Sequence, residues 1–167
     1  MNVAAYKKIQ QKPLRSRTLT FLLKDAEVLL GLKKKGFGKD YLLGIGGKVE
    51  DGETIEDAAA REVAEEINVE LLELHKVGVL NFYFPHIEDE SWNQQVHVFT
   101  TTAWTGEPQE SEEIKPAWFH LTHVPYDTMW DDAHYWLPSI FAGQRIEGEF
   151  VFDKELKVTD YHIKPLN

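Results

Sequence analysis

The chain has 167 residues, of which 43% are hydrophobic and 12% aromatic, so it is long and apolar enough for one globular domain and is not a disordered chain. Its formal net charge of −10 argues against nucleic-acid binding, because phosphate contacts need clustered Lys and Arg side chains. The chain has no cysteine, no long apolar segment and no apolar signal region, so we expect a soluble cytoplasmic protein without disulfides or a membrane span.

The first part of the chain predicts an arm followed by two strands. Residues 1–16 are polar and basic, which indicates a mobile arm or an edge segment outside a single domain at 17–167. Two strands, a basic glycine-flanked loop and an apolar run follow, at residues 17–23, 27–33, 33–38 and 41–45.

A glycine-rich loop and an amphipathic helix come next. The helix is predicted at 54–67, with Thr54 as its N-cap and Asp57 closing a capping box. Its buried stripe consists of Ala58, Ala59, Val63 and Ile67. Glycines allow positive φ angles and let the loop backbone approach a ligand closely; they are Gly46, Gly47 and Gly52.

Three carboxylates share one face of this helix, at Glu62, Glu65 and Glu66. They repel one another unless a cation binds between them, and hard oxygen ligands select Mg²⁺ or Mn²⁺ over Zn²⁺. Taken alone, such a run is also typical of a solvated helix face. Arg61 precedes it and can hold one carboxylate by a bidentate pair. The spacing of Arg61 and the three glutamates favours a metal site that binds a substrate diphosphate. The negative net charge does not oppose a small anionic substrate, because a bound cation reverses the local charge.

The second part alternates strands with acidic loops. Strands are expected at 76–84, 94–104 and 117–121, a short helical region begins at 124, and a helix spans 135–142. A late strand pair is predicted at 149–152 and 159–163. Mixed strands with two helices, and no repeat or linker, indicate an α+β fold.

The segment from Gly47 to Val69 resembles the signature of the Nudix hydrolases, Gly-x5-Glu-x7-Arg-Glu-U-x-Glu-Glu-x-Gly-U, where U is apolar. Eight of the nine specified positions match, including Glu53 and Arg61. Asn68 replaces the glycine that ends the helix, and asparagine is the non-glycine residue that best tolerates the left-handed conformation expected there. Residues 16–163 look like the MutT-related oxidised purine nucleoside triphosphate diphosphatases. The resemblance implies an α/β/α sandwich with a central mixed sheet.

The resemblance also implies a chemistry. A Mg²⁺-dependent (or Mn²⁺-dependent) diphosphatase would cleave purine (deoxy)nucleoside triphosphates such as 8-oxo-dGTP or 2-oxo-dATP to the monophosphate and pyrophosphate. The metal positions that it implies are the Gly46 carbonyl, Glu62, Glu65, Glu66 and the distant Glu113. The general base is one of Glu62, Glu66 and Glu113, Arg61 orients a glutamate, and Lys33 lies at the phosphate end beside the Gly46–Gly47 loop.

A purine pocket is implied as well, with aromatic walls at Phe37, Phe82, Phe84, Trp130 and Phe152. Core packing would equally explain Phe82 and Phe84, which alternate on one strand. Asp131 and Asp132 are candidates for a pair that shares a proton and reads the base edge. By straight count Asp132 matches one pocket aspartate and Ala133 replaces the second, although a one-residue shift would restore the pair.

Leu42 and Leu43 depart from the subfamily, which has tryptophan and asparagine at these positions. The family asparagine contacts the base, and an apolar side chain cannot make its hydrogen bonds. We therefore expect that oxidised bases are recognised more weakly or by other groups. The alternatives are a Nudix hydrolase of unmodified nucleotides, nucleoside diphosphate sugars or dinucleoside polyphosphates, and a non-catalytic nucleotide-binding domain. We expect a monomer that acts on a small-molecule nucleotide; RNA decapping is disfavoured by the net charge.

Overall fold

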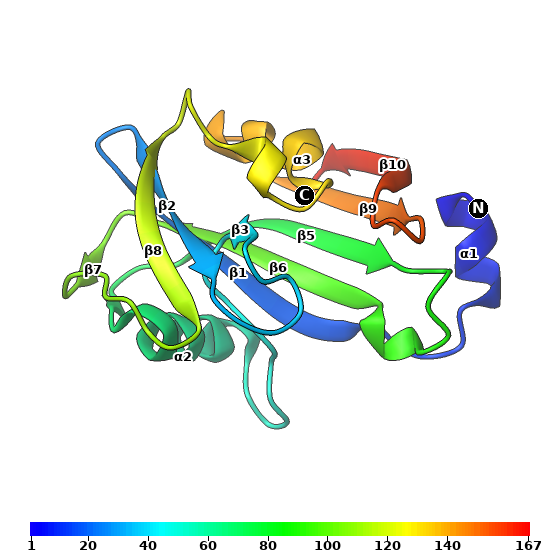
Figure 1. Ribbon diagram of the computed structural model, residues 1–167, viewed down its shortest axis with the longest axis horizontal. Coiled ribbons are helices and arrows are strands. Elements are labelled where there is room, and N and C mark those ends of the chain that lie inside the picture. Colours follow the sequence, from blue (N-terminus) through cyan, green and yellow to red (C-terminus); the bar gives the residue numbers. More distant parts are fainter.

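A mixed β-sheet runs through the protein, with α2 and α3 on its opposite faces (Figure 1). This computed structural model describes all residues, 1–167. The helices are α1 (Val3–Ile9), α2 (Ile55–Ile67) and α3 (Ala133–Phe141), with the 3₁₀ turns η1 (Glu90–Trp92) and η2 (Tyr126–Thr128). The strands are β1 (Arg15–Lys24), β2 (Glu27–Lys33), β3 (Leu42–Leu43), β4 (Glu70–Leu71), β5 (His75–Tyr83), β6 (Gln94–Thr101), β7 (Trp104–Thr105), β8 (Ile114–His120), β9 (Ile146–Phe152) and β10 (Val158–Pro165).

The strand order confirms the predicted α+β class. The main sheet runs β10-β9-β5-β6-β1-β2-β3, with β8 also paired to β2, while β4 and β7 form a separate pair. β1 pairs with β6, and β5 with β9, in parallel, whereas the other pairs are antiparallel. None of the helices has the length and apolar character needed to cross a bilayer.

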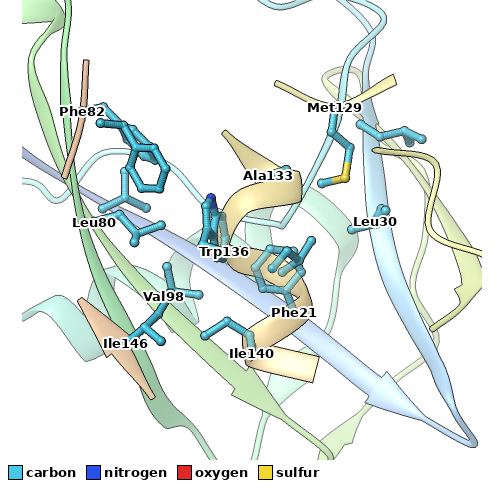
Figure 2. Close-up of a cluster of buried hydrophobic side chains, with 14 of the residues drawn as sticks. Phe21, Leu30, Leu80, Phe82, Val98, Met129, Ala133, Trp136, Ile140 and Ile146 are labelled. Carbon is cyan, nitrogen blue, oxygen red and sulfur yellow. The ribbon is translucent and has the colours of Figure 1, made fainter. Parts of the chain in front are cut away.

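Side-chain alternation along the strands divides the core between the two faces. On one face Phe21, Leu80 and Val98 pack against Trp136 and Ile140 of α3 (Figure 2). On the other face lies a smaller cluster with α2, made of Leu22, Leu29, Ile45, Val63, Ile67, Val69 and Ile114. Full burial of a Leu, Ile or Phe side chain contributes about 1.5–3 kcal/mol. The apolar stripe of α2 therefore fixes this helix on the sheet and leaves its acidic side at the rim.

The ends of α2 follow the sequence signals. The Thr54 hydroxyl accepts a hydrogen bond from the Asp57 amide at 3.0 Å, but Asp57 makes no bond back, so the predicted capping box is half formed. Asn68 ends the helix in the left-handed conformation, with φ 58° and ψ 42°, as its place in the signature predicts.

Two predictions are wrong. The segment predicted as a mobile arm contains α1, because Val3 and Tyr6 lie one turn apart and bury against Tyr83 and Val151. The strand predicted at 94–104 ends at Thr101, whose hydroxyl accepts a hydrogen bond from the Ala103 amide at 3.2 Å and so turns the chain into β7. The other predicted strands and helices are present, with small shifts at their ends.

His97 on β6 gives the fold a pH dependence. Its ring is 8% exposed and its Nδ1 has no hydrogen-bond partner, so burial, with the charge of Lys76, lowers its pKa from 6.5 to about 4. The unfolded chain takes up this proton below pH 6.5, whereas the folded chain stays neutral until about pH 4. Folding is thus stabilised above pH 6.5, and this contribution is lost as the pH falls toward 4, by about 3 kcal/mol in full.

We predict that His97→Gln flattens the pH dependence of stability. Between pH 7.5 and 4.5 the free energy of unfolding of the wild type should fall by about 2–3 kcal/mol more than that of the variant. Denaturant titrations at both pH values measure this difference. His75→Gln is the control, because its side chain is 63% exposed. Equal pH dependence in the wild type and His97→Gln would contradict the assignment.

Candidate active site

Before it reaches α2, the glycine-rich loop lies antiparallel beside β1. The Thr18 amide donates to the Gly47 carbonyl at 2.9 Å, and the backbones of Arg17 and Lys48 form an isolated β-bridge. A Cβ atom on Gly46 would overlap the Thr18 carbonyl oxygen, and one on Gly47 would lie 2.5 Å from the Glu62 carboxylate. Both glycines are therefore required by close approach, Gly46 to the strand and Gly47 to the acidic face of the helix.

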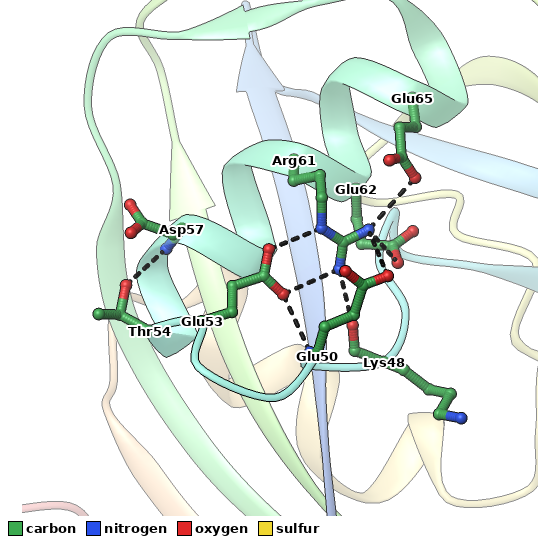
Figure 3. Close-up of polar contacts among 8 residues, drawn as sticks. All are labelled: Lys48, Glu50, Glu53, Thr54, Asp57, Arg61, Glu62 and Glu65. Atoms are coloured by element: carbon green, nitrogen blue, oxygen red, sulfur yellow. Dashed lines mark hydrogen bonds and ion pairs between the residues drawn. The ribbon is translucent and has the colours of Figure 1, made fainter.

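Arg61 fastens this loop to α2 (Figure 3). Its Nε donates to Glu53 Oε2 at 2.6 Å and its Nη2 to Glu53 Oε1 at 3.0 Å, which forms the predicted bidentate pair. Nη2 also donates to the Lys48 carbonyl at 2.9 Å. These bonds lower the pKa of Glu53 and raise that of Arg61, so both groups stay charged.

The acidic face is unevenly neutralised. Arg61 Nη1 donates to Glu62 Oε1 at 3.1 Å and to Glu65 Oε2 at 3.2 Å (Figure 3). Glu66 has no such partner, and its Oε2 is buried without a hydrogen bond. Burial, followed by the charges of Glu62 and Glu113, raises the pKa of Glu66 to about 8. The structure thus brings Glu113, which directly precedes β8, close to Glu66 on the acidic face.

This carboxylate set is chemically suited to a divalent cation. A buried carboxylate oxygen without a partner, next to other carboxylates, offers the hard oxygen ligands that Mg²⁺ and Mn²⁺ prefer. No three acidic side chains converge on one point in this structure, and Glu62 and Glu65 are turned toward Arg61. Cation binding would therefore require these two side chains to rotate away from Arg61.

An aromatic chain leads from the surface to the core near the basic loop. Phe84 and Phe152 stack at 4.9 Å with an interplanar angle of 9°, and Phe82 lies 5.8 Å from Phe152. All three are buried in the main core cluster, as the core-packing alternative predicts for Phe82 and Phe84. Phe37 lies 5.2 Å from Trp130 and is 53% exposed, so it marks the outer end.

Two residues of the aromatic chain were missed by the sequence analysis. Tyr41 stacks on Trp130 at 5.2 Å, and Trp92 contacts Phe37 at 4.4 Å and Phe84 at 5.7 Å. Both stand in otherwise polar loops, which was the available signal. The predicted Lys33 holds the basic loop in place, since its carbonyl accepts from the Asp40 amide at 2.8 Å.

The two aspartates bind different partners. Asp132 is buried and accepts a hydrogen bond from Trp136 Nε1 at 2.7 Å, while burial raises its pKa to about 6. Asp131 accepts from the Val158 amide at 2.8 Å. The expected shared proton is therefore wrong, because each carboxylate is held separately. Leu43 lies on β3 opposite Gly31, and its neighbour Leu42 is part of the core.

A cavity of about 350 Å³ lies away from these groups, on the outer face of β5, β9 and β10. Its carboxylates already have partners, because Glu149 pairs with Lys7 at 3.0 Å and Glu147 with Lys164 at 2.9 Å. The candidate active site is therefore the loop–helix junction, where a buried carboxylate oxygen has no hydrogen-bond partner.

Two known proteins are similar to most of this chain. The oxidized purine nucleoside triphosphate hydrolase of Mus musculus is 39% identical over 156 residues, which are 92% of this chain and 96% of that protein. The protein of the same name from Danio rerio is 42% identical over 135 residues, or 81% of this chain and 85% of that protein.

Solved structures confirm the architecture. A MutT protein from Bacillus halodurans covers 92% of this chain with a TM-score of 0.79 and 21% identity, which shows the fold alone. The family model of the NUDIX domain matches residues 13–140. Because this match spans most of the chain and contains the whole loop–helix junction, the chain belongs to the NUDIX family.

Proposed function

We propose that this chain is a Nudix pyrophosphohydrolase that removes oxidised purine (deoxy)nucleoside triphosphates, cleaving them to the monophosphate and pyrophosphate. The observation that carries the proposal is the buried Oε2 of Glu66, which has no hydrogen-bond partner although Glu62 and Glu113 lie near enough to raise the pKa of this carboxylate. The relatives from mouse and zebrafish, named for oxidised purine nucleoside triphosphates, support the substrate class. We further propose that the protein is a cytoplasmic monomer that acts on free nucleotides rather than nucleic acid.

Nudix hydrolases use divalent metal ions, and we propose Mg²⁺ here, with Mn²⁺ as a possible substitute. A bound cation would neutralise phosphate oxygens and lower the pKa of the attacking water. The residues that would hold it are Glu62, Glu66 and Glu113, joined by Glu65 and the Gly46 carbonyl. Arg61 holds the loop and the helix together and so fixes the two backbone segments from which most of these ligands extend.

The same carboxylates are proposed to accept the proton of the attacking water. Glu62, Glu66 and Glu113 are all candidates for the general base. Glu66 Oε2 is a buried carboxylate oxygen without a hydrogen-bond partner, and the raised pKa of Glu66, about 8, means that this group must lose a proton before it accepts one from water. A cation favours the ionised form of Glu66, so metal binding and base activation are coupled at this residue.

Recognition of the purine is assigned to the aromatic chain and to Asp132. Phe37 and Trp130 offer ring faces at the outer end, and base stacking contributes about 1–3 kcal/mol without discriminating well between bases. Asp132 is the polar group for discrimination, since its pKa of about 6 leaves it mostly ionised at neutral pH, able to accept hydrogen bonds from ring N–H groups. Leu43 has no polar side-chain atom, so it can contribute only to the shape of the base pocket.

A substrate panel tests the proposed function. We expect a kcat/KM preference of about tenfold or more for 8-oxo-dGTP or 2-oxo-dATP over dGTP and dATP, which corresponds to about 1.4 kcal/mol. The measurement is Mg²⁺-dependent pyrophosphate release at matched low concentrations. Equal rates on all four nucleotides would point to another Nudix substrate, and no release would favour a non-catalytic binding domain.

Glu66→Gln should lower kcat by at least about a hundredfold, the scale of a lost acid–base group. The substitution keeps size and shape but removes the charge that binds a cation and accepts a proton. Steady-state kinetics with saturating Mg²⁺ give the result, and Glu56→Gln on the same helix is the matched control. Near-normal turnover of Glu66→Gln would remove the residue from the catalytic set.

Gly47→Ala should lower kcat by at least about tenfold while the melting temperature stays close to that of the wild type. The added methyl group would lie 2.5 Å from the Glu62 carboxylate and so restrict the positions open to this proposed metal ligand, whose flexible end can move without disturbing the core. Gly143→Ala is the opposite control: its φ of 85° makes a side chain costly, by roughly 1–2 kcal/mol, far from the carboxylates. Normal activity of Gly47→Ala would show that Glu62 does not need the free space beside Gly47.

A further inference from the structure

The N-terminal segment is attached to the loop between β5 and β6. The amides of Gln11 and Lys12 both donate to Glu90 Oε1, at 2.8 and 3.2 Å. The Arg15 amide donates to the Asn93 carbonyl at 3.2 Å. Both acceptors lie in or beside η1, so the chain that follows α1 holds this turn at its two ends.

Asn93 makes the deepest of these contacts. It is 1% exposed, and its Nδ2 donates to the Tyr6 hydroxyl of α1 at 2.8 Å. Its Oδ1 accepts from the Phe84 amide at 2.9 Å. One buried side chain thus joins helix α1 to the end of β5 and closes the loop between residues 84 and 93. Loss of either bond would leave a buried polar atom without a partner, which the structure can relieve only by moving the amide.

The residue next to Asn93 belongs to the aromatic chain. Trp92 contacts Phe37 at 4.4 Å and Phe84 at 5.7 Å, both with their rings nearly perpendicular. It therefore lies between the exposed outer end and the buried inner end of the surface that the proposed function gives to the purine. The position of Trp92 depends on the backbone that Asn93 fixes.

We propose that Asn93 is a positioning residue for purine binding, which couples helix α1, through Tyr6, to the placement of Trp92 in the base pocket. Trp92 is then a further residue that determines specificity. The inference rests on the proposed function, because a base must occupy the aromatic chain for Trp92 to matter. Helix α1 lies outside the segment matched by the family model, and through Tyr6 and Asn93 it contributes to purine binding.

Tyr6→Phe tests the coupling, with Tyr83→Phe as the matched control. Both tyrosines lie in the same small cluster and pack edge to face at 5.6 Å. Only the Tyr6 hydroxyl bonds Asn93, whereas that of Tyr83 donates to Glu149 at 2.7 Å. Each substitution therefore removes one hydroxyl from the same surroundings, and one of them breaks the connection to Asn93.

Two measurements are made on each variant. Native-state hydrogen exchange of the Phe84 amide should accelerate by about tenfold in Tyr6→Phe and stay unchanged in Tyr83→Phe. KM for 8-oxo-dGTP should rise by roughly five- to tenfold in Tyr6→Phe at unchanged kcat, while both constants for deoxyribose 5′-triphosphate, which lacks a base, stay unchanged. Trp92→Leu should likewise raise KM for 8-oxo-dGTP and leave both constants for deoxyribose 5′-triphosphate unchanged.

The outcomes separate the two proposals. Unchanged exchange in Tyr6→Phe, or equal acceleration in Tyr83→Phe, would overturn the coupling whatever the enzyme hydrolyses. Faster exchange with an unchanged KM, or an equal effect on the base-free substrate, would leave Asn93 with a structural role only and overturn its role in purine binding. If the wild type does not prefer 8-oxo-dGTP over the base-free triphosphate, the proposed function fails, and the exchange data still decide whether Tyr6 controls the loop.

Discussion

The guanidinium of Arg61 is the group on which the acidic site depends. Two unit charges 4 Å apart interact with about 4 kcal/mol at an effective dielectric constant of 20, so adjacent carboxylates on one helix face are strongly opposed. Arg61 bonds Glu53, Glu62 and Glu65 and also the Lys48 carbonyl. It therefore reduces the repulsion and fixes the loop at the same time. A lysine could carry the charge but lacks the fork that reaches several acceptors at once.

Core packing decides which glutamate differs from the others. The buried stripe of α2 includes Val63 and Ile67, so Glu66, adjacent to Ile67, is drawn toward the sheet, whereas the side chain of Glu65 remains 60% exposed. Arg61 reaches Glu62 and Glu65 but makes no bond to Glu66. The lack of a hydrogen-bond partner at Glu66 Oε2 is thus a consequence of how the helix packs. The hydrophobic effect sets the electrostatics of the site.

The parts of the structure that local sequence determines were predictable. Helix α2, its left-handed end at Asn68 and the strands each follow from periodicity or from one residue type, and a bidentate pair of Arg61 with a carboxylate was expected, although its partner Glu53 was not named. Features that depend on distant contacts were not. α1 has only seven residues, too few to be stable alone, and it forms because Tyr83 and Val151 cover it. Asp131 and Asp132 are adjacent in sequence, yet the Val158 amide and Trp136 hold them apart.

Under the proposed function, one set of aromatic side chains serves both stability and recognition. Phe84 and Phe152 are at once core residues and the inner end of the aromatic chain, and truncating a buried phenylalanine costs about 3–5 kcal/mol. That end of the pocket cannot vary without loss of the fold. Change is tolerated at the outer end, where Phe37 and Tyr41 stand on a loop and are exposed. Differences in base preference between related chains should therefore arise from the loops around Trp130 and Trp92, which makes an apolar residue at Leu43 compatible with purine recognition.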